Sequence, residues 1–245
     1  MQNVIDRRMV AHHSQAGLDV AVLIDQRNTG AAAVAVLDVR AAAGRGIGPR
    51  QPDRAELWRL ATPAELVQGR ARTALAPGDL VLVPAGATLE LAPGAMPVGA
   101  TVAVVPGGPM GVARAGALPQ ALGSTASAGA APALTIVHAG GARRYAKGAS
   151  AATLLLERGP LAAAVVELDA GATMPPHVHR AETEVVYLEA GTGTFTVGGV
   201  AVPVTDTMVL VIPPGVEHGY VATTATRAYQ LYTPPGPEQR WKKSP

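Results

Sequence analysis

The sequence of 245 residues contains no cysteine, which excludes disulfides, thiolate metal sites, iron–sulfur clusters and cysteine nucleophiles. Any metal ion must therefore be bound by histidine and carboxylate side chains. Aromatic residues make up only 3 % of the chain and charged residues 16 %, although 48 % of the residues are hydrophobic. The apolar content is thus mainly small and aliphatic, which favours sheets lined by valine and alanine.

The chain also has almost no excess of positive over negative charge. Twenty Lys and Arg residues against eighteen Asp and Glu residues leave a formal net charge of only +2. Nucleic-acid binding depends on a strongly basic surface, so we expect no nucleic-acid partner.

The sequence has no uninterrupted apolar run of the length that a membrane helix needs. One long uncharged stretch, residues 91–113, contains four prolines and five glycines, which would leave backbone groups unpaired in lipid. Residues 1–10 carry Asp6, Arg7 and Arg8 where a signal peptide needs its apolar core. We therefore predict a cytoplasmic protein without membrane contact.

Short apolar runs separated by glycine and proline recur along the whole chain. They are rich in valine and lie among 28 glycines and 21 prolines, which is typical of strands and turns. We expect strands at residues 20–24, 33–39, 80–83, 102–105, 134–137, 153–156, 163–168, 184–188, 194–197, 208–212 and 228–232. Two short helices are predicted, one at residues 63–69 with Thr62 as its N-cap and one after Pro237. The fold class is all-β.

The two halves of the chain resemble each other. Residues 35–60 match residues 162–189, with Gly44 on Gly171 at an offset of 127 and a shift of two residues allowed within the match. Between the halves, residues 107–133 are mainly Gly, Ala, Pro and Ser with a single charge, a composition typical of a connection. We predict one β module used twice, as a first domain at residues 1–115, a connection at 116–133 and a second domain at 134–245.

Three of the six histidines and one glutamate form a compact pattern in the second half. His177 and His179 are separated by one residue, so on a strand both imidazoles would project from the same face. A following turn could bring Glu184 to the facing part of the sheet, and the tight turn at residues 213–215 could direct His218 inward. Three imidazoles and a carboxylate make a mixed N/O site for one divalent first-row metal ion, with one or two positions left for water or substrate.

The run GATMPPHVHRAETEVVYLEAG followed by IPPGVEH resembles the paired motifs of the cupin superfamily, small antiparallel barrels of jelly-roll form. The resemblance implies a metal site made of His177, His179, Glu184 and His218. The four-residue gap favours Glu184 over Glu182 as the acidic ligand. The implied cofactor is one divalent transition metal, Fe, Mn, Ni, Cu or Zn. The second motif departs from the usual pattern, because Ala222 stands where an asparagine is often found.

The first half carries the same motifs without their ligands. The positions of the three histidines hold Arg50, Pro52 and Leu89. None of these side chains can ligate a metal, and only Glu56 keeps its type. The chain therefore resembles a bicupin with a degenerate N-terminal barrel, over roughly residues 18–112 and 134–240. We expect Glu56 to pair with Arg50.

Several further side chains are candidates for the second barrel. Tyr220, two residues after His218, should point the same way as that ligand, and it is our candidate catalytic acid or hydrogen-bond donor. The alternative is a tyrosine that only packs the barrel. Tyr187 should point away from the cavity. Strand register alone does not show which of Tyr229, Gln230 and Tyr232 face the inside of the barrel.

Two more groups have simpler interpretations. Arg143, Arg144 and Lys147 form a basic cluster that could bind a carboxylate or a phosphate, although a solvated strand end explains it equally well. His138 is not part of any ligand-like motif, and we interpret it as a structural residue.

Three classes of function agree with such a site. The first is a metal-dependent oxidoreductase, such as a dioxygenase acting on a small chelating substrate. The second is a redox-neutral isomerase, decarboxylase or hydrolase, and the third is a non-catalytic protein that binds a metal or a small ligand. The scarcity of aromatic side chains argues against a large flat substrate and favours a compact, polar one. The sequence allows a homo-oligomer.

Overall fold

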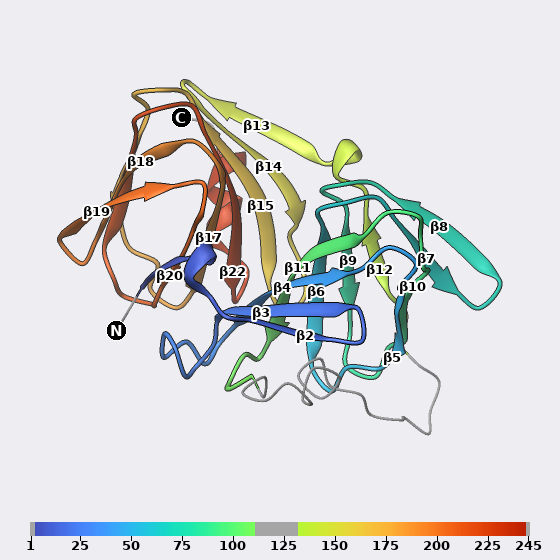
Figure 1. The fold of residues 1–245 in the computed structure, drawn as a ribbon. Helices are drawn as coiled ribbons and strands as arrows, with labels where there is room; N and C mark the ends of the chain where they lie inside the picture. Colours follow the sequence, from blue (N-terminus) through green and yellow to red (C-terminus); the bar gives the residue numbers. More distant parts are fainter. Residues whose placement is uncertain (1–2, 111–131, 244–245) are drawn as a thin grey trace. The chain divides into compact units, whose positions relative to one another are not determined.

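The computed structural model describes residues 3–110 and 132–243, and their regular structure is almost entirely β (Figure 1). The chain divides into two compact units, Val10–Gly141 and Met1–Met9 together with Ala142–Pro245. We name them the N-terminal barrel and the C-terminal barrel. Most of the predicted connection at residues 116–133 lies outside the described residues. Within the described ranges, no helix is long and apolar enough to span a bilayer.

The N-terminal barrel consists of two antiparallel sheets. A seven-stranded sheet has the order β12-β9-β6-β11-β4-β3-β2, and a four-stranded sheet has the order β5-β10-β7-β8. The strands are β2 (His12–Gln15), β3 (Leu18–Ile24), β4 (Ala35–Ala41), β5 (Ile47–Arg50), β6 (Ala55–Leu60), β7 (Ala64–Gln68), β8 (Ala71–Leu75), β9 (Leu80–Val83), β10 (Leu89–Leu91), β11 (Val98–Val105) and β12 (Thr135–Val137). Aliphatic side chains from both sheets, with Trp58, fill the space between them.

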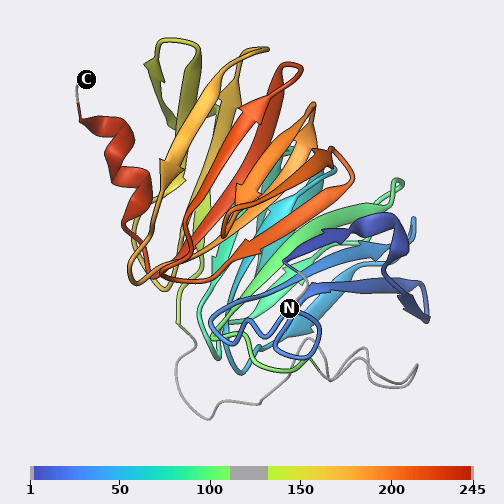
Figure 2. The same ribbon diagram turned by 90° about the vertical axis from the view of Figure 1, so that its left-hand side faces the viewer.

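The C-terminal barrel repeats this arrangement. Its sheets have the orders β1-β20-β17-β22-β15-β14-β13 and β16-β21-β18-β19, which match those of the N-terminal barrel strand for strand. The strands are β1 (Val4–Asp6), β13 (Arg143–Lys147), β14 (Ser150–Leu156), β15 (Ala162–Leu168), β16 (Thr173–His177), β17 (Thr183–Ala190), β18 (Thr192–Val197), β19 (Val200–Thr205), β20 (Met208–Ile212), β21 (His218–Ala222) and β22 (Thr226–Thr233). The 3₁₀ helix η4 (Pro237–Lys242) runs along one side of this barrel (Figure 2). The predicted repeat of one β module is therefore confirmed.

One strand of each large sheet comes from the segment that precedes the other barrel in the sequence. β1 pairs with β20 in the C-terminal barrel, with Ile5 opposite Val209, while β12 pairs with β9 in the N-terminal barrel. The predicted domains, residues 1–115 and 134–245, assign each of these two strands to the wrong barrel. Both strands form their backbone hydrogen bonds with an edge strand that is distant in the sequence. Three residues carry too little pattern to reveal their partner.

The helix predicted at residues 63–69 is wrong. Residues 64–68 form β7, which pairs with β8 through a tight turn at Gly69, whose φ is +62°. The hydroxyl of Thr62 does not cap a helix; it accepts from the Gly99 amide at 2.8 Å and donates to the Pro97 carbonyl at 3.1 Å. Strand pairing and the burial of Leu66 outweigh the local capping signal. The second predicted helix is present as η4.

Asp79 connects the turn before β9 to the segment after β12. Its carboxylate accepts from the backbone amides of Ala76 and Ala139 at 2.9 and 2.8 Å, and the ring of His138 lies 2.8 Å away. His138 therefore has a structural role, as predicted, although the sequence did not indicate Asp79 as its partner. Although burial would raise the pKa of the Asp79 carboxyl, these hydrogen bonds hold the pKa below its usual range.

We expect Asp79→Asn to destabilise the protein at neutral pH by about 1–3 kcal/mol, because its amide NH₂ would face one of the two backbone N–H donors from which the carboxylate now accepts. The folded-state pKa is depressed, so the stabilisation is present above the unfolded pKa of about 3.9 and disappears as the pH falls through the folded pKa. Urea denaturation of the wild type and the variant between pH 3 and pH 7 measures this, and the difference should shrink towards acid. The surface variant Asp53→Asn is the control, and an equal loss in both variants would contradict the expectation.

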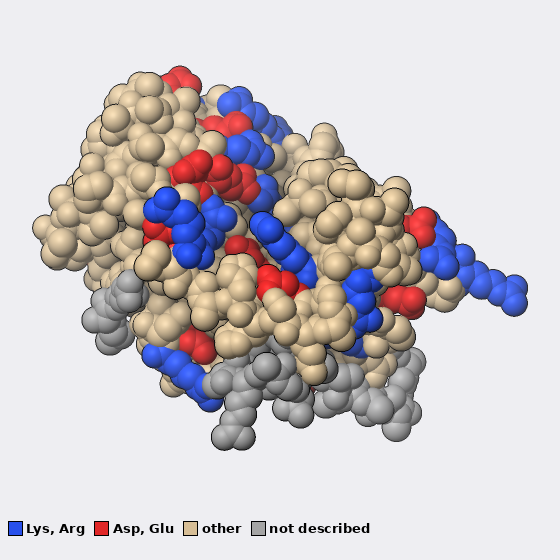
Figure 3. All heavy atoms as spheres, viewed as in Figure 1, with Lys and Arg blue, Asp and Glu red and all other residues tan. Residues whose placement is uncertain are grey.

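Charges on the surface are mixed rather than gathered by sign. Figure 3 shows Lys and Arg side chains beside Asp and Glu side chains, and Arg227 pairs with Glu167 and Glu189 at 2.7 and 3.0 Å. The face over β18 and β19 is uncharged, since residues 191–205 contain no Asp, Glu, Lys or Arg (Figure 3). That no nucleic acid binds stays a prediction.

Candidate metal centre

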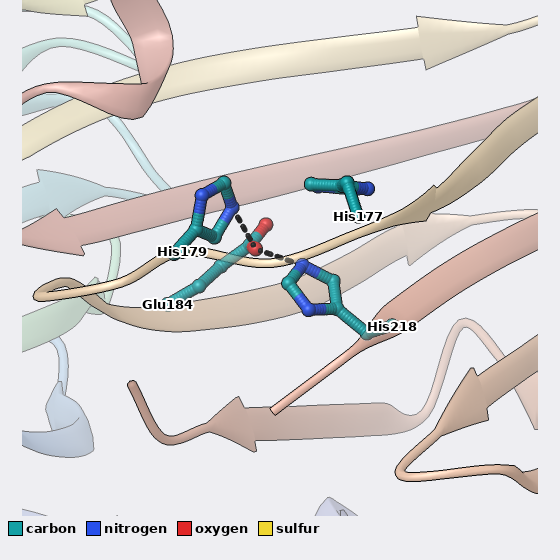
Figure 4. A group of neighbouring side chains, drawn as sticks. All are labelled: His177, His179, Glu184 and His218. Atoms are coloured by element: carbon teal, nitrogen blue, oxygen red, sulfur yellow. Dashed lines mark hydrogen bonds and ion pairs between the residues drawn. The ribbon is translucent and has the colours of Figure 1, made fainter. Parts of the chain in front are cut away.

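Four side chains from separate segments of the C-terminal barrel converge on one point. One donor atom each from His177, His179, Glu184 and His218 lies within 4.8 Å of the others (Figure 4). His177 ends β16 and lies opposite His218, the first residue of β21, while Glu184 comes from β17. His179 lies in the loop between β16 and β17, where its carbonyl accepts from the Gly215 amide at 2.8 Å. The turn at residues 213–215 thus holds the loop that carries the second histidine.

Backbone carbonyls orient two of the three imidazoles. Nδ1 of His177 lies 2.9 Å from the Pro175 carbonyl oxygen, and Nδ1 of His218 lies 2.9 Å from the Val216 carbonyl oxygen. A carbonyl oxygen can only accept, so Nδ1 carries the proton in both rings. When these rings are neutral, each Nε2 therefore presents a lone pair to the cluster, which is the usual arrangement of a metal-ligating histidine.

The contacts around Glu184 fit a cation. One carboxylate oxygen, Oε2, lies 3.0 Å from Nε2 of His179 and 2.9 Å from Nε2 of His218. A neutral His218 with its proton on Nδ1 would place two lone pairs face to face at this distance. Positive charge relieves the conflict, either as a proton on the imidazole or as a metal ion bound to both groups. The donor set of nitrogen and carboxylate oxygen suits a divalent transition metal.

The pKa values of His177, Glu184 and His218 reflect the same competition between burial and charge. Burial would raise the pKa of Glu184, but hydrogen bonds from the two histidines outweigh it and bring the pKa to about 2. Burial would lower the pKa of His218, but the Glu184 carboxylate raises it above its ordinary value. Burial lowers the pKa of His177. The Glu184 carboxyl is therefore anionic at neutral pH.

His179 is the least supported of the three imidazoles. It is buried, and its Nδ1 has no hydrogen-bond partner among the described residues. Its ring meets the edge of Tyr232 at 5.7 Å between centroids. Packing, the loop carbonyl and the contact of Nε2 with Glu184 thus determine its orientation.

The cluster borders a cavity of about 280 Å³ inside the C-terminal barrel. Its walls are largely apolar and include Leu168, Met174, Val186, Leu188, Phe195 and Ala228. Gln230 and Tyr232 face the cavity, whereas Tyr229 is not among the lining residues, which settles the register that the sequence left open. Tyr187 points away, as predicted, and its ring packs against the Arg7 guanidinium at 4.1 Å.

Two tyrosine hydroxyls reach the cavity wall. Tyr220 lines the cavity, packs on Phe195 at 4.7 Å between centroids, and shares a 2.9 Å hydrogen bond with the hydroxyl of Thr226. Tyr232 donates to the Gln230 side-chain oxygen at 2.6 Å. Burial, and then the negative charge of Glu184, raise the pKa of Tyr232 well above its ordinary value, and burial raises the pKa of Tyr220. Both hydroxyls are protonated donors at neutral pH.

The three residues of the predicted basic cluster, Arg143, Arg144 and Lys147, have different surroundings in the structure. Arg143 and Arg144 are exposed, and Arg144 pairs with Glu167 at 3.2 Å. Lys147 lines the cavity together with Arg240 from η4. Sequence reasoning missed Arg240 as a cavity residue, because no motif spacing links the tail after the last strand to the barrel interior.

The corresponding position of the N-terminal barrel holds an ion pair. The Arg50 guanidinium donates to both oxygens of Glu56 at 2.6 and 2.8 Å, as predicted, and the Trp58 indole donates to Glu56 at 2.7 Å. Leu89 is fully buried beside them. In this barrel a guanidinium therefore balances the carboxylate that a metal would balance in the other.

Comparison with known proteins agrees with this geometry. Residues 164–232 match the cupin domain family model. Among curated proteins no match is found. The fold resembles that of the oxalate decarboxylase of Lactobacillus farciminis in its formate complex, with a TM-score of 0.75 at 13 % identity over 96 % of this chain and 87 % of that chain.

Two structures of Bacillus subtilis oxalate decarboxylase are similar as well. The one at pH 4.6 has a TM-score of 0.72 at 13 % identity, over 95 % of this chain and 76 % of that chain. One from a study of its Mn(II) centres has a TM-score of 0.74 at 12 % identity, over 96 % and 78 %. At such identities the likeness establishes the fold alone. Residues 164–232 thus match the cupin domain, and the whole chain shares the two-barrel fold of these structures, with Arg50, Pro52 and Leu89 in the N-terminal barrel where the C-terminal barrel has histidines.

Proposed function

We propose that this protein is a metal-dependent enzyme that binds one divalent transition metal, Mn(II) or Fe(II), and decarboxylates a compact carboxylate substrate. The metal ligands would be His177, His179, Glu184 and His218. The observation that carries the proposal is the convergence of two carbonyl-oriented Nε2 atoms on a buried carboxylate, inside a cavity large enough for a small organic acid. A purely metal-binding protein has no need of such a cavity.

The cavity wall supports the chemistry of decarboxylation. The C–C bond to the carboxylate breaks, carbon dioxide leaves, and the electron pair stays on the neighbouring carbon, which must then receive a proton. Tyr232 lines the cavity and lies opposite Glu184 in the sheet, so its protonated hydroxyl is our candidate donor, and water that enters the cavity would return the proton. A metal bound here would supply Lewis-acid stabilisation of the negative charge on the substrate. The fold is shared with oxalate decarboxylases, one of them with Mn(II) centres.

An oxygen-dependent oxidoreductase is the second candidate. Three histidines and one glutamate leave two positions of an octahedral ion for exogenous ligands, which suits a chelating substrate together with molecular oxygen. The sequence places this class first, and it requires oxygen as a co-substrate, whereas decarboxylation without net oxidation consumes none.

The decisive experiment compares gas exchange over a panel of small carboxylic acids. Protein purified without chelator is first analysed for bound metal, and then carbon dioxide release and oxygen uptake are recorded. Turnover that releases carbon dioxide without stoichiometric oxygen uptake supports the decarboxylase. Stoichiometric oxygen uptake selects the oxidoreductase, and a bound metal without turnover on any acid contradicts both.

Two conservative variants identify the proton donor. If Tyr232 protonates the product carbon, Tyr232→Phe lowers kcat by roughly 10²- to 10⁴-fold, while Tyr220→Phe changes it by less than about fivefold. The opposite pattern supports Tyr220, the candidate from the sequence. Metal content is the control, since neither hydroxyl is a proposed ligand. Unchanged kcat in both variants would remove tyrosine from the mechanism.

A further inference from the structure

Two cations and one carboxylate line the cavity of the C-terminal barrel. Lys147 and Arg240 carry the positive charges, and Glu184 is the only acidic residue among the lining residues. The cavity is therefore positive before any metal binds, and a divalent ion adds to that charge. Such a site favours an anion over a neutral ligand.

The helix that carries Arg240 is anchored to the barrel. Lys147 donates from Nζ to the Arg240 carbonyl at 2.8 Å, and Gln239 donates to Glu157 at 2.8 Å. Glu238 is almost fully buried and accepts from the Gly236 amide at 2.8 Å. These contacts hold the backbone of η4, including that of Arg240. They do not involve the Arg240 guanidinium.

The Arg240 guanidinium itself is uncommitted. In the part of the chain that the structure describes, it forms no ion pair or side-chain hydrogen bond, whereas the Lys147 ammonium is engaged by a carbonyl. Arg240 lines the same cavity as His218 and Tyr232, so its side chain borders the space into which the four-residue cluster faces. Arg240 is also an exposed residue, so the cavity meets solvent where this side chain lies.

We propose that Arg240 determines the substrate class by binding a second acidic group, so that the preferred ligand is a dicarboxylate. One carboxylate would bind at the metal and the other at the guanidinium. This inference rests on the metal site of the proposed function. A planar guanidinium binds a carboxylate through two parallel hydrogen bonds, which selects an acid with a second carboxylate over a monoacid of the same length.

The test uses the full chain loaded with Co(II), whose visible absorption reports ligand binding without turnover. Malonate, succinate and glutarate are titrated against the monoacids of equal length, propionate, butyrate and valerate. For at least one length, we expect the diacid to bind about 10- to 100-fold more tightly, as a hydrogen-bonded charge pair provides. Arg240→Gln should abolish that preference, and Arg240→Lys should restore part of it. Lys243→Gln, on the exposed residue after η4, should leave it intact.

Three results would overturn the proposal. A diacid preference that persists in Arg240→Gln would mean that both carboxylates chelate the metal. An equal loss in Lys243→Gln would indicate a general effect of surface charge. Absence of any diacid preference in the wild type would also contradict it while leaving the metal site intact, whereas failure of Co(II) to bind would overturn the proposed function itself.

Discussion

Replacing Arg50 by methionine is expected to destabilise the N-terminal barrel by about 3–5 kcal/mol. The Glu56 carboxylate is 2 % exposed and receives two hydrogen bonds from this guanidinium, so the variant leaves a buried charge without its cation. Urea denaturation followed by fluorescence measures the loss. Because the chain has two tryptophans, a Trp241→Phe background leaves Trp58, which contacts Glu56, as the reporter of this barrel.

The double variant Arg50→Met, Glu56→Gln is the matched control. Its neutral amide oxygen can still accept from the Trp58 indole, while no charge remains to be buried. We therefore expect it to recover most of the stability lost in the single variant, since a buried ion pair is often replaceable when both charges are removed together. A single variant as stable as the wild type would show that the ion pair does not hold the degenerate barrel together.

Removing His218 is expected to abolish tight metal binding. His218→Ala deletes a proposed ligand that also contacts Glu184, and even changes behind a ligand cost 10- to 100-fold in metal affinity, so we expect a loss of more than about 100-fold. Metal content after gel filtration and competition with a fluorescent chelator measure it. His138→Ala, which alters a histidine paired with Asp79 outside the site, should keep the metal.

Metal removal gives a second readout of the same site. A ligand that binds only the folded protein stabilises it, so a chelator should lower the Tm of the wild type and of His138→Ala. The Tm of His218→Ala should not respond. Full metal content in His218→Ala, or a chelator response equal to that of the wild type, would exclude the four-residue centre as the metal site.

The motif around the metal centre could be predicted from local spacing. Two histidines in i and i+2 positions share a face of any extended segment, and a Pro-Pro-Gly turn aims the residue that follows it, whatever the rest of the chain does. The pairing of Arg50 with Glu56 follows from the same repeat, because the degenerate motif keeps the geometry of the intact one. The valine-rich strands are equally local, since short apolar runs between glycine and proline favour strands over helices.

The sequence by itself thus determined the all-β class, the duplicated module, the four converging donor residues and the lack of histidine ligands in the N-terminal barrel. Only the tertiary structure decided the exchange of β1 and β12, the strand at residues 64–68, the inward register of Gln230 and Tyr232, and the presence of Arg240 beside the cavity. These features depend on partners that are distant in the chain. A three-residue edge strand or a short terminal helix is stabilised mainly by the surface on which it packs. Its own residues do not show which surface that is.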